Sequence, residues 1–267
     1  MQAYNNIDQR LHLLIQTIAK ANRTYVTTKP DDSHTNLYFD ELDNRLVGHW
    51  INNGQEKLML TLNLETLDLE WLNDTKELIY SVPTTGRLVA DFESEIESKL
   101  PEINLRAQGF IDGLHYQIPD YPFAREPISS IDKASMDDWK SYRNLANELC
   151  ALVLGDLQLE DDIRIWPHHF DTGIYVEVSK KLGLGFGLAM EDNIAGAPYF
   201  YMSGYPLQGS LEYSGLPELI TGGWEIGENW SGSILPINKL KNGLYEDNKD
   251  AVNDYLSKSI NWFVSRS

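Results

Sequence analysis

Two adjacent histidines followed by an aspartate are the residues whose types and spacing best suit chemistry. Residues 166–171 read Trp, Pro, His, His, Phe, Asp. Imidazole and carboxylate groups ligate divalent metals and transfer protons near neutral pH. Neighbouring side chains in a strand point to opposite faces, so His169 and Asp171 form the better catalytic pair. The competing interpretation is structural, with the two side chains bonded to each other or to the backbone where a strand begins.

The same segment also offers groups for binding rather than catalysis. Trp166 supplies a ring and His168 a second imidazole, so both are candidates for ligand binding. We expect no metal site, because the chain has one cysteine and no His-Glu-x-x-His spacing.

A third histidine, His34, lies in a segment that is similar to the first. Pro30 and Pro167 are 137 residues apart (167 − 30), and a threonine and a tyrosine coincide at the same offset. An internal duplication would place His34 at the position equivalent to Asp171, so that the two could face one shared cleft. The alternative is that the Asp-Ser pair before His34 is an ordinary turn.

Aromatic and acidic residues alternate further along the chain. Trp224 and Trp230 bracket Glu225 and Glu228, and Tyr201 belongs to an aromatic segment before them. Rings beside carboxylates suit stacking on a sugar or an organic cation. The competing interpretation is that the rings belong to the core and that the two glutamates are solvated loop residues.

Alternating glycines occupy one short segment, at Gly183, Gly185 and Gly187. Neither a following Lys-Ser or Lys-Thr pair nor a helix signal accompanies them, so the segment is not a phosphate-binding or dinucleotide-binding loop. Alternating glycines leave one face of a strand bare, which lets another backbone, an aromatic ring or a ligand approach closely. We favour packing.

The elements that would position these residues are readable from hydrophobic periodicity. Apolar residues recur at helical spacing in four segments: 11–18, 88–96, 142–153 and 252–263. Ser135 and Asp138 form a weak capping box before the third segment. The period changes to two in residues 58–71, 173–178 and 182–188, which is typical of antiparallel strands with one buried face. The fold class is therefore α+β, with mainly antiparallel, twisted sheet and about four helices.

Two similar halves are one interpretation of this order. Proline-rich residues 119–137 are the best connector, between an α+β half at 1–118 and a second at 138–267. We expect the two halves to form one globule.

Six segments in chain order carry a resemblance to a known family. They are residues 11–20, 34–39, 87–92, 169–174, 198–206 and 233–236. These segments resemble the bacterial DUF5996 family, whose opening helix reads roughly L-H-x-x-x-Q-x-x-G-K. Ala19 stands where the family has glycine, and the family's tryptophan pair before His34 is missing. The resemblance implies a shared fold and no activity, because none is established for the family.

Composition excludes several classes of function. The net charge is −18, and residues 1–120 and 121–267 each contribute −9 (10 basic and 19 acidic, 12 basic and 21 acidic). A diffuse negative field repels phosphate backbones and anionic lipid, so we expect neither nucleic acid nor membrane as a partner. The single cysteine, Cys150, lies on an apolar helix stripe and should be buried. With no signal peptide evident, the expected location is cytoplasmic.

Three functions remain open. The first is a non-catalytic protein that binds a small molecule, since aromatic and acidic residues occur without a complete catalytic motif. The second is a metal-assisted or acid/base hydrolase that uses His169 and Asp171 with His34. The third is a structural or interaction protein. The sequence indicates no particular cofactor and no oligomeric state.

Overall fold

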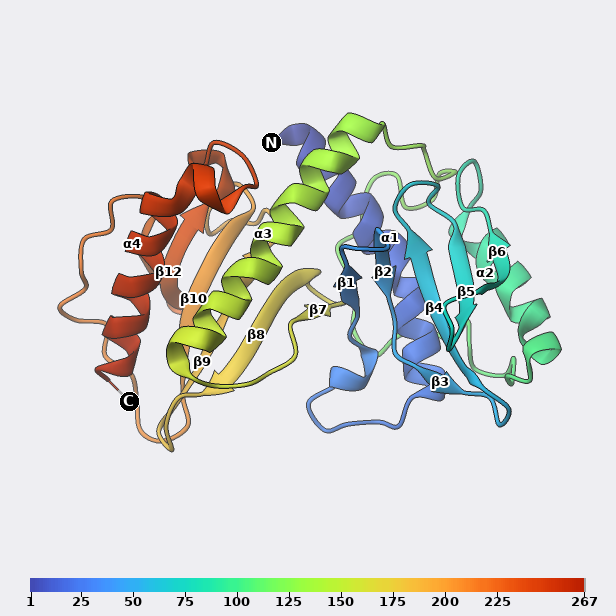
Figure 1. The fold of residues 1–267 in the computed structure, drawn as a ribbon, viewed down its shortest axis with the longest axis horizontal. Coiled ribbons are helices and arrows are strands. Elements are labelled where there is room, and N and C mark those ends of the chain that lie inside the picture. The colour runs from blue at the N-terminus through green and yellow to red at the C-terminus, as the bar shows by residue number, and fades with distance from the viewer. Residues whose placement is uncertain (267) are drawn as a thin grey trace. The chain divides into compact units, whose positions relative to one another are not determined.

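The computed structural model describes residues 1–266, and their fold is α+β, as predicted (Figure 1). All four expected helices are present, each longer than its periodic segment. They are α1 (Gln2–Tyr25), α2 (Val89–Lys99), α3 (Lys133–Leu157) and α4 (Tyr245–Val264). Three short 3-10 helices, η1 (Ser33–Thr35), η2 (Leu100–Ile103) and η3 (Ile237–Lys239), are also described. Within the described residues, no helix combines the length and the apolar composition that a membrane span needs.

The start of α3 lies earlier than the predicted capping box. The Asp132 carboxylate accepts a hydrogen bond from the Ser135 amide at 3.0 Å, and the Met136 amide bonds to the Asp132 carbonyl at 3.1 Å. Asp132 is thus the N-cap, and Ser135 lies inside the first turn. This hydrogen bond is the first cause that lowers the pKa of Asp132. The prediction of Ser135 as the capping residue is therefore wrong, although serine and aspartate both favour helix starts.

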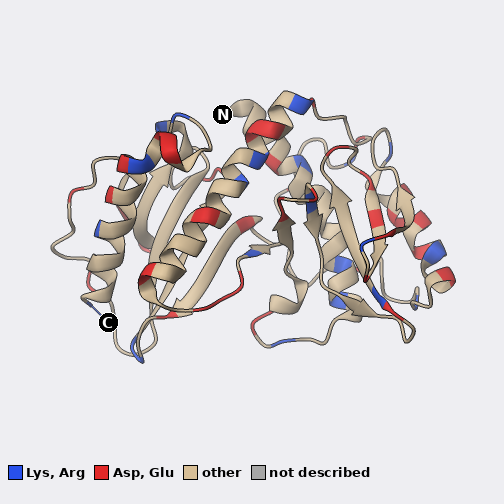
Figure 2. Cartoon of the chain, viewed as in Figure 1, with Lys and Arg blue, Asp and Glu red and all other residues tan. Residues whose placement is uncertain are grey.

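The chain divides into two compact units. The N-terminal unit contains Asn6–Met136 and Ile165–Phe170, and the C-terminal unit contains Met1–Asn5, Asp137–Arg164 and Asp171–Ser267. In sequence order, both sets of strands are preceded by a long helix and followed by another. Acidic side chains occur in both units rather than in one segment (Figure 2).

The first sheet is antiparallel and has six strands in the order β1-β2-β4-β5-β6, with β3 paired to β4. The strands are β1 (Tyr38–Asp40), β2 (Arg45–Val47), β3 (Ile51–Asn52), β4 (Lys57–Asn63), β5 (Leu69–Asn73) and β6 (Leu78–Val82). Helix α1 covers one face: a Cβ added at Gly48 would lie 2.8 Å from Ile18 of this helix. Leu46, Leu60 and Leu62 share that face and are buried. Alternation therefore places Arg45, Thr61 and Glu70 on the opposite face.

The second sheet is also antiparallel, in the order β11-β12-β10-β9-β8-β7. The strands are β7 (Arg164–Trp166), β8 (Asp171–Glu177), β9 (Leu182–Ala189), β10 (Tyr199–Pro206), β11 (Gly223–Ile226) and β12 (Ser231–Pro236). Helices α3 and α4 cover one face (Figure 1). The Tyr255 hydroxyl of α4 bonds to the Ser233 carbonyl at 3.1 Å, and Cys150 of α3 lies against the Phe186 carbonyl. Cys150 is fully buried, as the sequence predicts.

Candidate functional site

The histidine pair belongs to a tight turn. The amides of His169 and Phe170 both bond to the Trp166 carbonyl, at 3.3 and 2.6 Å. Phe170 has a φ of 56°, in the left-handed region that a bulky residue adopts only when its surroundings require it. Phe170 is also fully buried. Burial of this ring therefore holds the turn in place.

Helix α1 anchors this turn. His12 Nε2 and Gln16 Nε2 lie 2.9 and 2.8 Å from the Pro167 carbonyl oxygen. A carbonyl only accepts, so Nε2 of His12 carries a proton and donates it. The His12 ring also stacks on Phe170, with centroids 5.4 Å apart and planes 3° apart. His12 and Gln16 are one helical turn apart, which is why both reach the same oxygen.

The sequence candidates around the turn contact one another through their rings. The His168 ring lies 4.4 Å from His169 and 6.0 Å from Trp166, measured between centroids. His169 is exposed, and its hydrogen bond to Trp166 uses the backbone. Asp171 belongs to the other unit and accepts a hydrogen bond from Tyr201 instead. Among residues 1–266, no three His, Cys, Asp or Glu side chains are grouped to hold a metal ion.

His34 lies in the N-terminal unit, on η1, and is buried. The Lys29 amide donates to its Nδ1 atom at 3.3 Å. An amide cannot accept, so Nδ1 is unprotonated, and the contact with Asp32 at 3.6 Å is no hydrogen bond. Asp32 instead lies 3.1 Å from the exposed His115. These contacts match the turn interpretation of the segment.

The two tryptophans around the glutamates lie on opposite sides of the second sheet. Trp224 packs on Trp262 and Phe263 of α4, with centroids 5.0 and 5.7 Å away. Trp230 covers Gly232 on the other side, where an added Cβ would lie 2.8 Å from its ring. Trp224 is therefore half-buried against α4, and the two rings do not form one stacking clamp. Glu225, on β11, and Glu228, after it, are both exposed, so the expectation of loop residues is wrong for Glu225.

The glycine strand carries aromatic rings on its bare face. A Cβ added at Gly185 would lie 2.9 Å from the ring of Tyr205, and one at Gly183 would lie 2.6 Å from the Tyr175 ring. Across the strand, a Cβ at Gly173 would lie 3.1 Å from the Tyr201 hydroxyl. Packing, the interpretation favoured from sequence, thus takes the form of tyrosine side chains that lie close over glycines.

These rings form one surface, which we call the tyrosine face. It is the side of β8–β12 opposite α3 and α4, and it carries Tyr175, Tyr201 and Tyr205 with Trp230. Tyr175 and Tyr205 contact each other edge to face, with centroids 5.7 Å apart. They are 40% and 42% exposed, so both residues are open to solvent.

One polar contact orients the inner end of the tyrosine face. The Tyr201 hydroxyl donates to Asp171 Oδ2 at 2.7 Å. Burial, and then the charge of Asp171, raises the pKa of Tyr201 well above its usual value, so its hydroxyl stays a donor. The other carboxylate oxygen, Oδ1, is buried and has no hydrogen-bond partner among the described residues. Among the described residues, Asp171 is thus hydrogen-bonded to Tyr201 and to no cationic side chain.

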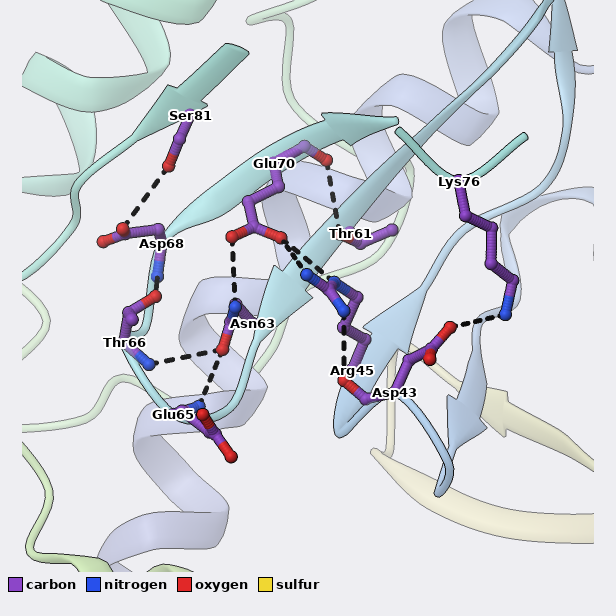
Figure 3. A network of polar contacts seen from close by, with 10 residues as sticks. All are labelled: Asp43, Arg45, Thr61, Asn63, Glu65, Thr66, Asp68, Glu70, Lys76 and Ser81. Atoms are coloured by element: carbon purple, nitrogen blue, oxygen red, sulfur yellow. Dashed lines mark hydrogen bonds and ion pairs between the residues drawn. The ribbon is translucent and has the colours of Figure 1, made fainter. Parts of the chain in front are cut away.

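In the first sheet, the polar side chains on the face opposite α1 form hydrogen bonds with one another (Figure 3). Arg45 donates from Nε and Nη2 to one oxygen of Glu70, at 3.0 and 2.8 Å. The other Glu70 oxygen accepts from Asn63 at 3.0 Å. Thr61 and Glu70 are buried there, so the prediction of one buried face for residues 58–71 is wrong.

Sequence reasoning found Tyr201 and missed the other two rings. Tyr175 lies in the predicted strand 173–178, and Tyr205 lies in the segment 198–206. Neither pattern marks the residue as a binding group. A usable signal was present, because β8 and β10 each place tyrosine on the face shared with the glycines of β9. Strand pairing, which the sequence does not give, was needed to recognise it.

Comparisons with known proteins give no indication of function. The chain matches no family model, no curated protein and no solved structure. The resemblance to the DUF5996 family therefore stays a prediction.

Proposed function

We propose that this protein binds a small molecule without transforming it, and that the tyrosine face is the binding surface. The observation that supports this most is the exposure of Tyr175 and Tyr205 above glycines. Glycine keeps the backbone flat beneath the rings, so a ligand can lie against them without meeting other side chains. Exposed aromatic rings grouped on one surface are typical of interaction sites.

The chemistry of the face favours binding over catalysis. Burial is the first cause that raises the pKa of Tyr175, Tyr201 and Tyr205, so each phenol is neutral and weakly nucleophilic near neutral pH. Burial also raises the pKa of Cys150, on the helix side of the sheet. Among the described residues, the positions of this face hold no histidine that could serve as a general base.

The hydrolase hypothesis has less support. His169 is exposed and Asp171 is bonded to Tyr201, so neither orients the other by a hydrogen bond. A triad-like relay depends on such contacts. An interaction protein is the remaining alternative, and a ligand screen separates it from a small-molecule binder.

Saturation-transfer NMR on a mixture of choline, glucose and indole tests the proposal. At least one compound should receive saturation from the wild-type protein and should stay chemically unchanged on long incubation. The signal should disappear in the Tyr175→Ala/Tyr205→Ala variant. It should persist in Trp50→Ala, which removes a ring of similar exposure, 42%, from the N-terminal unit.

Two results would contradict the proposal. One is a signal that the double tyrosine variant retains in full, which would move binding elsewhere. The other is that all three compounds, and a wider set of cations, sugars and aromatics, give no signal.

A further inference from the structure

We infer that the ligand of the tyrosine face is an organic cation of the quaternary-ammonium class. This inference rests on the proposed function and narrows it to one ligand chemistry. It depends on three features of the face: its charge, its rings and the lack of amide and guanidinium side chains at its strand positions.

The charge of the tyrosine face has one sign. Strand register places the carboxylates of Asp171, Glu177 and Glu225 on this side of the sheet. The positions of β8, β9, β10, β11 and β12 that share the face include no lysine or arginine. Arg143 reaches the sheet from α3, where it bonds to Thr172 at 2.9 Å on the helix side. A cation is therefore attracted to this face, and an anion is repelled.

The rings suit a cation that keeps little water. Quaternary ammonium groups bind to the faces of aromatic rings, which carry the negative part of the ring quadrupole. Tyr175 and Tyr205 meet edge to face, so neither ring covers both faces of the other, and a methylated ammonium group can contact a ring face that stays open. The hydrogen bond from Tyr201 to Asp171 moves electron density into the Tyr201 ring and makes its face more negative.

Neutral sugars fit the face less well. Sugar recognition needs donors and acceptors arranged around the hydroxyl groups, usually amide or guanidinium side chains beside the stacking ring. Of the polar groups here, the Ser203 hydroxyl already donates to the Ser231 carbonyl at 2.8 Å, and Tyr201 donates to Asp171. Besides the hydroxyls of Tyr175 and Tyr205, the face thus offers negative charge and ring surface, which a cation uses together and a neutral sugar uses in part.

A pair of isosteric probes tests the inference. Choline and 3,3-dimethylbutan-1-ol have the same shape and differ in a charged nitrogen against a neutral carbon. We expect choline to shift the ring signals of ¹³C-labelled Tyr175, Tyr201 and Tyr205 saturably, and the alcohol to bind about tenfold more weakly. Added salt should weaken choline binding and leave the alcohol unchanged.

Two double variants distinguish the effect of the carboxylates of the face on choline binding from the effect of the net charge of the chain. Glu177→Gln/Glu225→Gln removes two exposed carboxylates from the face and should weaken choline binding about threefold. Glu65→Gln/Glu77→Gln makes the same change of net charge in the N-terminal unit and should leave binding unaltered. Asp171→Asn should weaken choline binding further, provided that its spectrum shows the native fold.

The outcomes distinguish this inference from the proposed function. Equal binding of the two isosteres, or glucose binding alone, would overturn the inference and leave a ligand-binding tyrosine face. Equal weakening by the two glutamate double variants would also overturn it, because net charge alone would then explain the effect. Failure of every compound in the screen would overturn both.

Discussion

The two sheets of this protein differ in the residues on the face that no long helix of their own unit covers. In the first sheet, Arg45 and Glu70 pair with each other, and Asn63 satisfies the remaining carboxylate oxygen (Figure 3). In the second sheet, rings lie over glycines, and one oxygen of Asp171 has no hydrogen-bond partner among the described residues.

The difference indicates which face has been left available. A buried ion pair whose oxygens are all satisfied is already complete, and any ligand would have to compete with it. In contrast, exposed rings and a carboxylate oxygen without a partner contribute favourable interactions only when a ligand binds to them. The comparison therefore assigns stability to the polar face of the first sheet and supports our proposal that the tyrosine face of the second binds a ligand.

The largest effect on stability is expected from Glu70→Ala in the first sheet. Removal of the carboxylate leaves the guanidinium of Arg45 without its partner at a site where the Glu70 side chain is 8% exposed. We expect the free energy of unfolding to fall by about 3 kcal/mol in urea titrations followed by circular dichroism. Glu65→Ala, an exposed control nearby, should change it by less than about 0.5 kcal/mol. A loss below about 1 kcal/mol for Glu70→Ala would remove the basis for the comparison.

Two glycine variants sharpen the description of the tyrosine face. An added Cβ at Gly187 would meet the Thr172 carbonyl and would lie 2.9 Å from Gly173 Cα, so the backbone of β8 must move. At Gly183 the obstacle is the side chain of Tyr175, which can rotate into solvent. Gly187→Ala should cost about 2–3 kcal/mol of unfolding free energy and Gly183→Ala less than about 1. Ligand binding should nevertheless fall in Gly183→Ala, because its ring is displaced.

Equal destabilisation by the two alanines in thermal and urea unfolding would contradict this description. It would mean that Tyr175 is locked in place by the fold and is not a mobile ring over an open strand.

The smallest effect concerns the pH dependence of stability. The folded-state pKa of Tyr201 is raised, first by burial and then by Asp171. Its contribution to stability is therefore fully present below the unfolded pKa of about 10 and declines at higher pH, by at most about 1.4 kcal/mol per pH unit. Tyr201→Phe should lose about 1 kcal/mol at neutral pH and should show a correspondingly shallower decline above pH 10. An unchanged slope in urea titrations across this range would show that Tyr201 ionises freely.

Local pattern predicted the elements of the fold, because helices and strands each impose a period on buried residues. The helical spacing of residues 142–153 correctly marked the centre of α3, and alternation in residues 182–188 correctly marked β9. The same pattern failed at Arg143, which is fully buried with its guanidinium 5.1 Å from the Trp139 ring. Charge normally marks a solvated position, and only the tertiary contact shows otherwise.

The candidate site was less predictable, because contacts between distant segments decide it. The histidine turn drew attention by composition, yet its geometry depends on His12, which is 155 residues away from Pro167 in the chain. The tyrosine face depends on the register of three strands, and Tyr175 acquires its role only when it lies beside Gly183. Residue types indicated aromatic and acidic binding chemistry, and strand pairing determined which residues take part.

The most direct test of the tyrosine face is a ring-resolved NMR titration of ¹³C-tyrosine-labelled protein with choline, followed by the other compounds of the screen. The account predicts saturable shifts at Tyr175, Tyr201 and Tyr205, with Tyr25 of the N-terminal unit unchanged as an internal reference. Unshifted signals from all three rings with every compound would contradict it.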